Sequence, residues 1–181
     1  MRTPYNDDHS LIGVEGDWKV KYDTCVVFVK ATNSKEDWLS NLIAIPFPLQ
    51  LVGKLGWCHL GYRGYAYWLT GMIHTILSSR PEVTKLVVVG YSMGGGIAQM
   101  VGVLADEWID DVTTKIVSID GPRTTSRLPK NIKLLRNRGS LVADIPPWFK
   151  KAPETVLSTT CRPFWKAHKD YDIEAIIKNE E

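Results

Sequence analysis

The chain has 181 residues, of which 44% are hydrophobic and 23% charged, and its formal net charge is +2. This length predicts one domain over residues 1–181, because chains usually divide into several cores only above roughly 250 residues. The small net charge argues against a nucleic-acid partner, and the longest apolar runs are too short for an integral membrane protein.

The cysteines and the N-terminal sequence bear on the compartment. Cys25, Cys58 and Cys161 are odd in number and widely spaced, which favours reduced, mostly buried thiols over a disulfide framework. The first residues lack the apolar stretch of a signal peptide. We therefore expect a cytoplasmic protein, with release by lysis left open.

The first half of the chain predicts one strand, two helices and a loop. Residues 24–29 are apolar and rich in β-branched side chains, as in a buried strand. A serine cap with an acid three residues later begins a short helix at 34–39. Residues 44–57 contain prolines and glycines and predict a loop. Apolar residues at helical spacing predict a long amphipathic helix over 62–78, which ends before Pro81.

The second half predicts alternating strands and helices. Residues 86–89 are wholly apolar, which is typical of a strand in the middle of a parallel sheet. A helix follows over 94–106, then strands over 115–119 and 132–135, and a closing helix over 170–178. Strands that alternate with helices require crossover connections, so the fold class is α/β, with a mostly parallel sheet and helices on both faces.

The motif GYSMG at residues 90–94 lies between the apolar strand and the following helix. This is the context of a nucleophile elbow, in which Ser92 is presented on a strained strand-to-helix turn. Gly90 and Gly94 occupy the positions where a side chain would collide with a neighbouring strand or helix. The backbone N–H of Met93 is then one donor of an oxyanion hole. A glycine-rich turn that matches five residues by chance is the alternative.

A general base is the next requirement, and histidine most often supplies it. In this fold the catalytic order along the chain is serine, acid, histidine. Of the four histidines, only His168 follows Ser92. His168 is therefore the predicted base, although an exposed histidine is by itself more often a solvated loop residue.

Five segments, in this order, make the chain resemble the class 3 lipases, the fungal triacylglycerol lipases and their bacterial and phage relatives. The resemblance implies an α/β-hydrolase fold with a minimal cap or a small lid at about residues 33–57. It covers about residues 24–168. The matching segments are 27–32, 37–42, 59–62, 90–95 and 121–123.

The resemblance also assigns residues around the nucleophile. It implies that Thr32 supplies the second oxyanion donor and that Trp38 lies near the acyl pocket. Tyr91, inside the elbow, is a second candidate for a substrate contact. Without the resemblance, Thr32 would be an ordinary strand residue and Trp38 a core aromatic.

The catalytic acid is where the chain departs from the family. Residues 137–147 align with the segment that carries the acid, but Ser140 stands in the acid's place. A serine cannot stabilise an imidazolium as a carboxylate does. Asp120, at the end of the strand over 115–119, and Asp144, four residues beyond Ser140, are the alternatives. We favour Asp120 slightly because a strand end is more rigid than a loop. A dyad without an acid is the third option.

The sequence thus predicts a serine esterase or lipase that acts on a small-molecule ester or lipid through an acyl-enzyme. No metal or organic cofactor is expected, because His and Cys residues show no metal-ligand spacing and the elbow lacks a phosphate-loop sequence. A thioesterase, an acyltransferase or a peptidase with the same triad remains open. A catalytically weakened hydrolase fold that serves as a binding module also remains open, because of Ser140.

Overall fold

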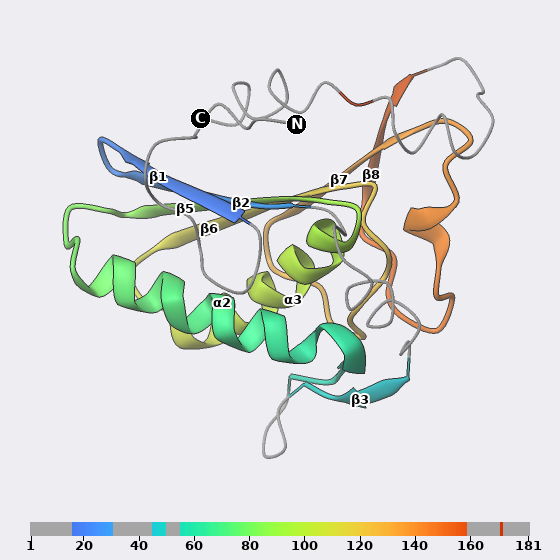
Figure 1. Cartoon of the computed structure of the whole chain (residues 1–181), viewed down its shortest axis with the longest axis horizontal. Helices are drawn as coiled ribbons and strands as arrows, with labels where there is room; N and C mark the ends of the chain where they lie inside the picture. The colour runs from blue at the N-terminus through green and yellow to red at the C-terminus, as the bar shows by residue number, and fades with distance from the viewer. Residues whose placement is uncertain (1–15, 31–44, 50–54, 159–170, 172–181) are drawn as a thin grey trace.

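A computed structural model of the chain describes residues 16–30, 45–49, 55–158 and 171. Its centre is a six-stranded sheet with the strand order β1-β2-β5-β6-β7-β8 (Figure 1). β1 pairs antiparallel with β2, and every other neighbouring pair is parallel. The strands are β1 (Gly16–Lys21), β2 (Thr24–Val29), β5 (Lys85–Tyr91), β6 (Thr113–Ile119), β7 (Ile132–Asn137) and β8 (Glu154–Ser158).

Two α-helices, α2 (Leu60–Ser78) and α3 (Met93–Trp108), pack on one face of this sheet, below it in Figure 1. Side chains of β2 and β5 that point to this face form the main core with the buried sides of both helices. α3 is the more central helix, since 13 of its 16 residues are buried. A helix with so wide an apolar surface is stable only inside a protein, which fixes α3 against the middle of the sheet.

The opposite face of the sheet carries a second apolar cluster. Alternate residues of the central strands are buried there, as the period of two in a strand requires. Tyr171 packs into the same cluster, and Tyr91 lies against it. The strand residues of the cluster are Val26, Phe28, Val87, Val89, Val117, Ile119 and Leu135.

Smaller elements surround the carboxyl ends of the strands. A two-stranded antiparallel sheet is formed by β3 (Pro46–Pro48) and β4 (Trp57–His59). A short 3-10 helix, η1 (Val142–Asp144), follows β7. The backbone N–H of His59 donates to the carbonyl of Thr124 at 2.8 Å, which joins the small sheet to the segment after β6.

The predicted α/β class with a mostly parallel sheet is confirmed, and the strands and helices expected over 24–29, 62–78, 86–89, 94–106, 115–119 and 132–135 all occur. Helices were expected on both faces of the sheet, whereas the two described α-helices lie on one face. The prediction missed β1 and β8, which lie at the two edges of the sheet. It also described all of 44–57 as a loop, although β3 and the start of β4 lie there. The helix expected at 34–39 and most of the one at 170–178 lie outside the described residues.

Cys25 and Cys58 are fully buried and form no disulfide. Burial disfavours a thiolate and raises the pKa of Cys25 to about 11 and that of Cys58 to about 12. These two cysteines are therefore inert core residues, as the sequence predicts, and Cys161 lies outside the described residues.

Among the helices that the structure describes, none has the length and apolar character needed to cross a bilayer.

Candidate active site

Ser92 is the single residue between the end of β5 and the start of α3. Its backbone has φ 54° and ψ −121°, a combination that a residue with a side chain rarely adopts. The Ser92 N–H donates to the carbonyl of Ile119 at 2.9 Å, and its carbonyl accepts the N–H of Gly96 at 3.2 Å. The strained turn is thus held by β6 on one side and by α3 on the other, while the serine itself stays partly exposed.

The two glycines of the motif are required by close backbone approaches. A Cβ atom on Gly90 would lie 2.1 Å from the carbonyl oxygen of Gly94. A Cβ atom on Gly94 would lie 2.2 Å from the carbonyl oxygen of Val29 and 2.4 Å from that of Lys30. All three distances are far inside van der Waals contact, so neither position accepts a side chain without movement of the backbone.

The first turn of α3 faces the same point. Met93 is the first residue of this 16-residue helix and is buried. The first N–H groups of an α-helix have no partner within the helix, and together they carry a partial positive charge. The backbone of Met93 is therefore suited to stabilise negative charge near Ser92. Thr32 and Trp38, the other predicted contacts around the nucleophile, lie outside the described residues.

Asp120 follows the last residue of β6, the strand next to β5. Tyr91 and Ile119 are partners in the β5–β6 register, so Ser92 and Asp120 directly follow a paired position. The N–H of Asp120 donates to the carbonyl of Leu135 on β7 at 2.7 Å. Asp120 is fully buried and has a positive φ of 47°, so its position is fixed by the neighbouring strands.

Ser140, the residue in the family's acid position, is in direct contact with this carboxylate. Its hydroxyl donates a short hydrogen bond to Oδ2 of Asp120, and only 2% of Ser140 is exposed. The structure thus brings together the two residues that the sequence left as separate alternatives. The carboxylate is present beside the place where the family has it, although it comes from a different strand.

Two tyrosines lie near Asp120. The hydroxyl of Tyr171 accepts the backbone N–H of Asn137 at 2.7 Å. Burial, the charge of Asp120 and a hydrogen bond to it raise the pKa of Tyr171. Burial and the same charge raise the pKa of Tyr91 to about 12, and the two rings are 5.8 Å apart. The substrate contact predicted for Tyr91 stays a prediction.

Asp144 has different surroundings from Asp120. Its carboxylate forms ion pairs with Arg136 at 2.7 Å, Lys151 at 2.8 Å and Arg123 at 3.3 Å. Burial acts to raise the pKa of Asp144, but hydrogen bonds from Lys151 and Arg136 outweigh it and lower the pKa to about 2. Asp144 therefore connects the segment after β7 to its neighbours as part of an ion-pair network.

Two residues near the site, Tyr171 and Gln99, were not among the residues predicted from the sequence. Tyr171 gave no signal because an aromatic residue near a chain end is most simply a core residue. Gln99 was also missed, and its amide donates to Ser118 Oγ at 3.1 Å and to the carbonyl of Pro122 at 3.0 Å. Ser118 donates in turn to the carbonyl of Gly95 at 3.1 Å. These buried hydrogen bonds hold the first turns of α3 against the end of β6.

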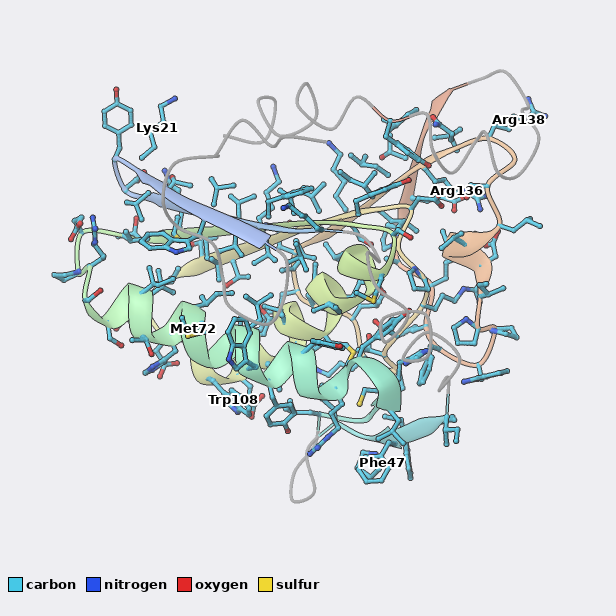
Figure 2. All side chains as sticks on the ribbon, in the orientation of Figure 1. Lys21, Phe47, Met72, Trp108, Arg136 and Arg138 are labelled. Carbon is cyan, nitrogen blue, oxygen red and sulfur yellow. The ribbon has the colours of Figure 1, made fainter. Side chains whose placement is uncertain are left out.

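A cavity of about 340 Å³ lies at the opposite edge of the sheet, where the parallel strands begin. Its lining includes Lys21, Lys85 and Lys115 but neither Ser92 nor Asp120. Figure 2 shows Lys21 and Arg136 at opposite ends of the sheet, which separates this cavity from the proposed site. Within the described ranges, no three His, Cys, Asp or Glu side chains gather as metal ligands would.

Comparisons with known proteins agree with this architecture. A family model described as the PGAP1-like alpha/beta domain matches residues 64–144, which include Ser92, Asp120 and Ser140. No curated protein matches the chain in sequence. The sheet order, the strand-to-helix turn at Ser92 and the acid at the next strand end together define an α/β-hydrolase fold.

Several solved structures that are similar to this chain in fold are lipases. A triacylglycerol lipase from Penicillium expansum has a TM-score of 0.64 at 14% identity, over 89% of this chain and 70% of that one. The mono- and diacylglycerol lipase from Aspergillus oryzae has a TM-score of 0.63 at 18% identity, over 84% and 64%. The Rhizomucor miehei lipase, in its propeptide complex, has a TM-score of 0.58 at 16% identity, over 76% and 50%. This chain thus has the fold of the fungal lipases, as the motifs indicated, and matches about half the length of the last of them.

The glycine contacts lead to a first prediction. Gly94→Ala should lower the free energy of unfolding by about 1–3 kcal/mol or more, because the new methyl group must displace the end of β2. Gly71→Ala is the control, since nothing lies within 4 Å of a Cβ at that position in α2. That variant should gain up to about 1 kcal/mol from helix propensity. Urea unfolding measures both, and equal effects would contradict the close approach.

The ion pairs of Asp144 lead to a second prediction. Because its folded pKa, about 2, lies below the unfolded value of roughly 3.9, Asp144 stabilises the fold above pH 4 and loses this effect as pH falls toward 2. Asp144→Asn should therefore cost about 1–3 kcal/mol at pH 7, and the difference from wild type should shrink below pH 4. Urea unfolding at several pH values measures this. Asp110→Asn, at an exposed position, should change little at any pH, and a difference for Asp144→Asn that is independent of pH would contradict the assignment.

Proposed function

We propose that the protein is a serine hydrolase that cleaves carboxylic esters through an acyl-enzyme intermediate. The observation that carries the proposal is the strained, partly exposed Ser92 at the start of α3, beside a buried carboxylate at the next strand end. Strained backbone at a helix N-terminus is costly to maintain, and it serves to present a nucleophile where negative charge will develop.

The reaction follows from the roles of these groups. Ser92 Oγ attacks the ester carbonyl carbon while His168 accepts the hydroxyl proton, and the backbone N–H groups of Met93 and Thr32 stabilise the oxyanion. Collapse of the tetrahedral intermediate breaks the carbon–oxygen bond of the ester, and the leaving alcohol takes the proton from His168. Water then repeats the sequence at the acyl-enzyme and releases the acid and free Ser92.

Chain connectivity supports His168 as the base. His168 stands three positions before Tyr171, and three residues of fully extended chain span at most about 11 Å. Tyr171 is buried and hydrogen-bonded at the end of β7, close to Asp120. The short connection to Tyr171 therefore supports His168 as the partner of this carboxylate.

The surroundings of the two aspartates favour Asp120 as the acid. Asp120 follows β6, the strand next to the serine's strand, and its backbone N–H donates to Leu135 of β7, so it stands on a rigid strand end. Asp144 shares its charge with three cationic side chains. Those ion pairs fix the segment after β7, whereas the strand end next to the serine holds Asp120 rigidly, so Asp120 is the better candidate.

The substrate class rests on the fold and on the surface near the strand ends. The similar structures include lipases named for triacylglycerols and for mono- and diacylglycerols, which supports lipid esters here too. Trp57 and Trp148 are both more than half exposed. Their segments meet through Thr125 and Ser126, which bond to the backbone of Lys150 and Trp57. An exposed apolar rim of this kind suits a substrate with an acyl chain.

A third prediction tests the reaction class. The native chain should react with a fluorophosphonate probe and hydrolyse p-nitrophenyl esters faster than acyl-CoA thioesters or peptide anilides. Ser92→Ala should abolish labelling and lower the hydrolysis rate by a factor of about 10⁴ or more. Ser79→Ala, which removes a hydroxyl at the end of α2, is the control and should label normally.

Two outcomes would overturn the proposal. A native chain that neither labels nor hydrolyses any of the three substrate classes would indicate a hydrolase fold retained for binding. Labelling that persists in Ser92→Ala would place the nucleophile elsewhere. A clear preference for thioesters or anilides would keep the serine mechanism and replace the ester as substrate.

A fourth prediction separates the two aspartates. Asp120→Asn should lower kcat by up to about four orders of magnitude, because an amide cannot stabilise the imidazolium. Asp144→Asn should change kcat less than about tenfold while it lowers stability. The kcat of both variants is measured without urea, at a pH where each variant is folded. If neither changes kcat, the protein works as a dyad without an acid; a loss confined to Asp144→Asn would reverse the assignment.

A further inference from the structure

The carboxylate of Asp120 lies in a small buried cluster of hydroxyl groups that the ester mechanism does not itself require. Ser140 donates a hydrogen bond to it, and the phenol of Tyr171 is hydrogen-bonded to it as well. Ser140 and Tyr171 are both more than nine-tenths buried. They come from different parts of the chain, 31 positions apart, so their meeting at one carboxylate is a property of the fold and not of local sequence.

The end of β7 fixes both hydroxyl-bearing residues. The N–H of Asn137, its last residue, donates to the Tyr171 hydroxyl at 2.7 Å. The carbonyl of the same residue accepts the N–H of Ser140 at 3.2 Å. Arg136 adds a long contact of 3.5 Å to the Ser140 carbonyl. The backbone of one strand residue, Asn137, therefore contacts both residues that carry the hydroxyl groups.

We infer that Ser140 and Tyr171 are positioning residues that orient the Asp120 carboxylate toward His168. This inference rests on the proposed function. Neither touches the substrate or the reacting atoms. Their hydroxyl groups restrict rotation of the carboxylate and supply the hydrogen bonds that a buried charge requires. The serine at the family's acid position is then part of the working site and not a sign of lost function.

The identity of residue 140 matters for charge. A second carboxylate in hydrogen-bond contact with Asp120 would repel it, and one of the two acids would take up a proton. A serine hydroxyl fills the same place with a donor and leaves a single negative charge. Tyr171 adds a second donor whose pKa the same charge raises, so it stays protonated as a donor must.

Two substitutions remove one hydroxyl group each and little else. Ser140→Ala and Tyr171→Phe should each lower kcat for the preferred p-nitrophenyl ester by about 10- to 100-fold, because small displacements of catalytic groups have effects of this size. KM should stay within about twofold. The matched controls are Thr70→Val and Tyr67→Phe, which remove hydroxyl groups that bond to backbone carbonyls of Ala66 and Leu49. Both controls should keep kcat within about threefold.

Combination with Asp120→Asn distinguishes positioning from a general loss of structure. If the hydroxyl groups act through Asp120, Ser140→Ala and Tyr171→Phe should lower kcat less than about threefold once Asp120 is an amide. Independent structural effects would instead multiply. Urea unfolding of every variant confirms that kcat is measured on folded protein.

The outcomes separate this inference from the proposed function. An active native chain in which both single variants keep kcat within threefold, or in which their losses multiply with that of Asp120→Asn, overturns the positioning role alone. A native chain without labelling or hydrolysis overturns the ester mechanism and the inference with it. If one single variant does not fold, the other carries the same cycle.

Discussion

The close approach between the first turn of α3 and the ends of β2 and β5 is the constraint on which the site depends. It exists because Gly90 and Gly94 leave no Cβ atoms between a helix and two strands. Without that approach the N-terminus of α3 would lie farther from the sheet, and Ser92 would have no reason to adopt positive φ. The same contact places the positive end of the helix at the carboxyl edge of the parallel strands, where ligands of open α/β sheets bind.

Much of this arrangement was predictable from the sequence because it is local. The apolar run at 86–89, the GYSMG motif and the amphipathic helix each follow from a few consecutive residues. β1 was missed because it has the weak period-two pattern of Asp17, Trp18, Lys19 and Val20, which is too short to stand out from a loop. β8 was missed because an edge strand with half-exposed residues has little apolar signal.

The proposed acid was harder to predict because its surroundings depend on contacts between distant segments. In the sequence, Ser140 appears as a missing carboxylate and Asp120 as a turn residue before Gly121. Only the parallel pairing of β6 with β7 brings the two side chains together. Tyr171 shows the same limit, since nothing in its neighbours indicates that its hydroxyl would bond to β7. Residue types and spacing predict a candidate nucleophile, whereas the partners of a buried charge depend on the fold.

The two aspartates near this edge then divide two tasks. Asp144, surrounded by cations, fixes the segment after β7, and that segment carries Ser140. Asp120, the proposed acid, is buried at the end of β6 and accepts a hydrogen bond from the Ser140 hydroxyl. If the two carboxylates exchanged their surroundings, neither would suit its proposed role. Hydroxyl groups would hold the loop less firmly than ion pairs do, and a carboxylate paired to three cations would give little to an imidazolium. The fold therefore places ionic contacts at the half-exposed rim and neutral donors at the buried acid, where each costs least in desolvation.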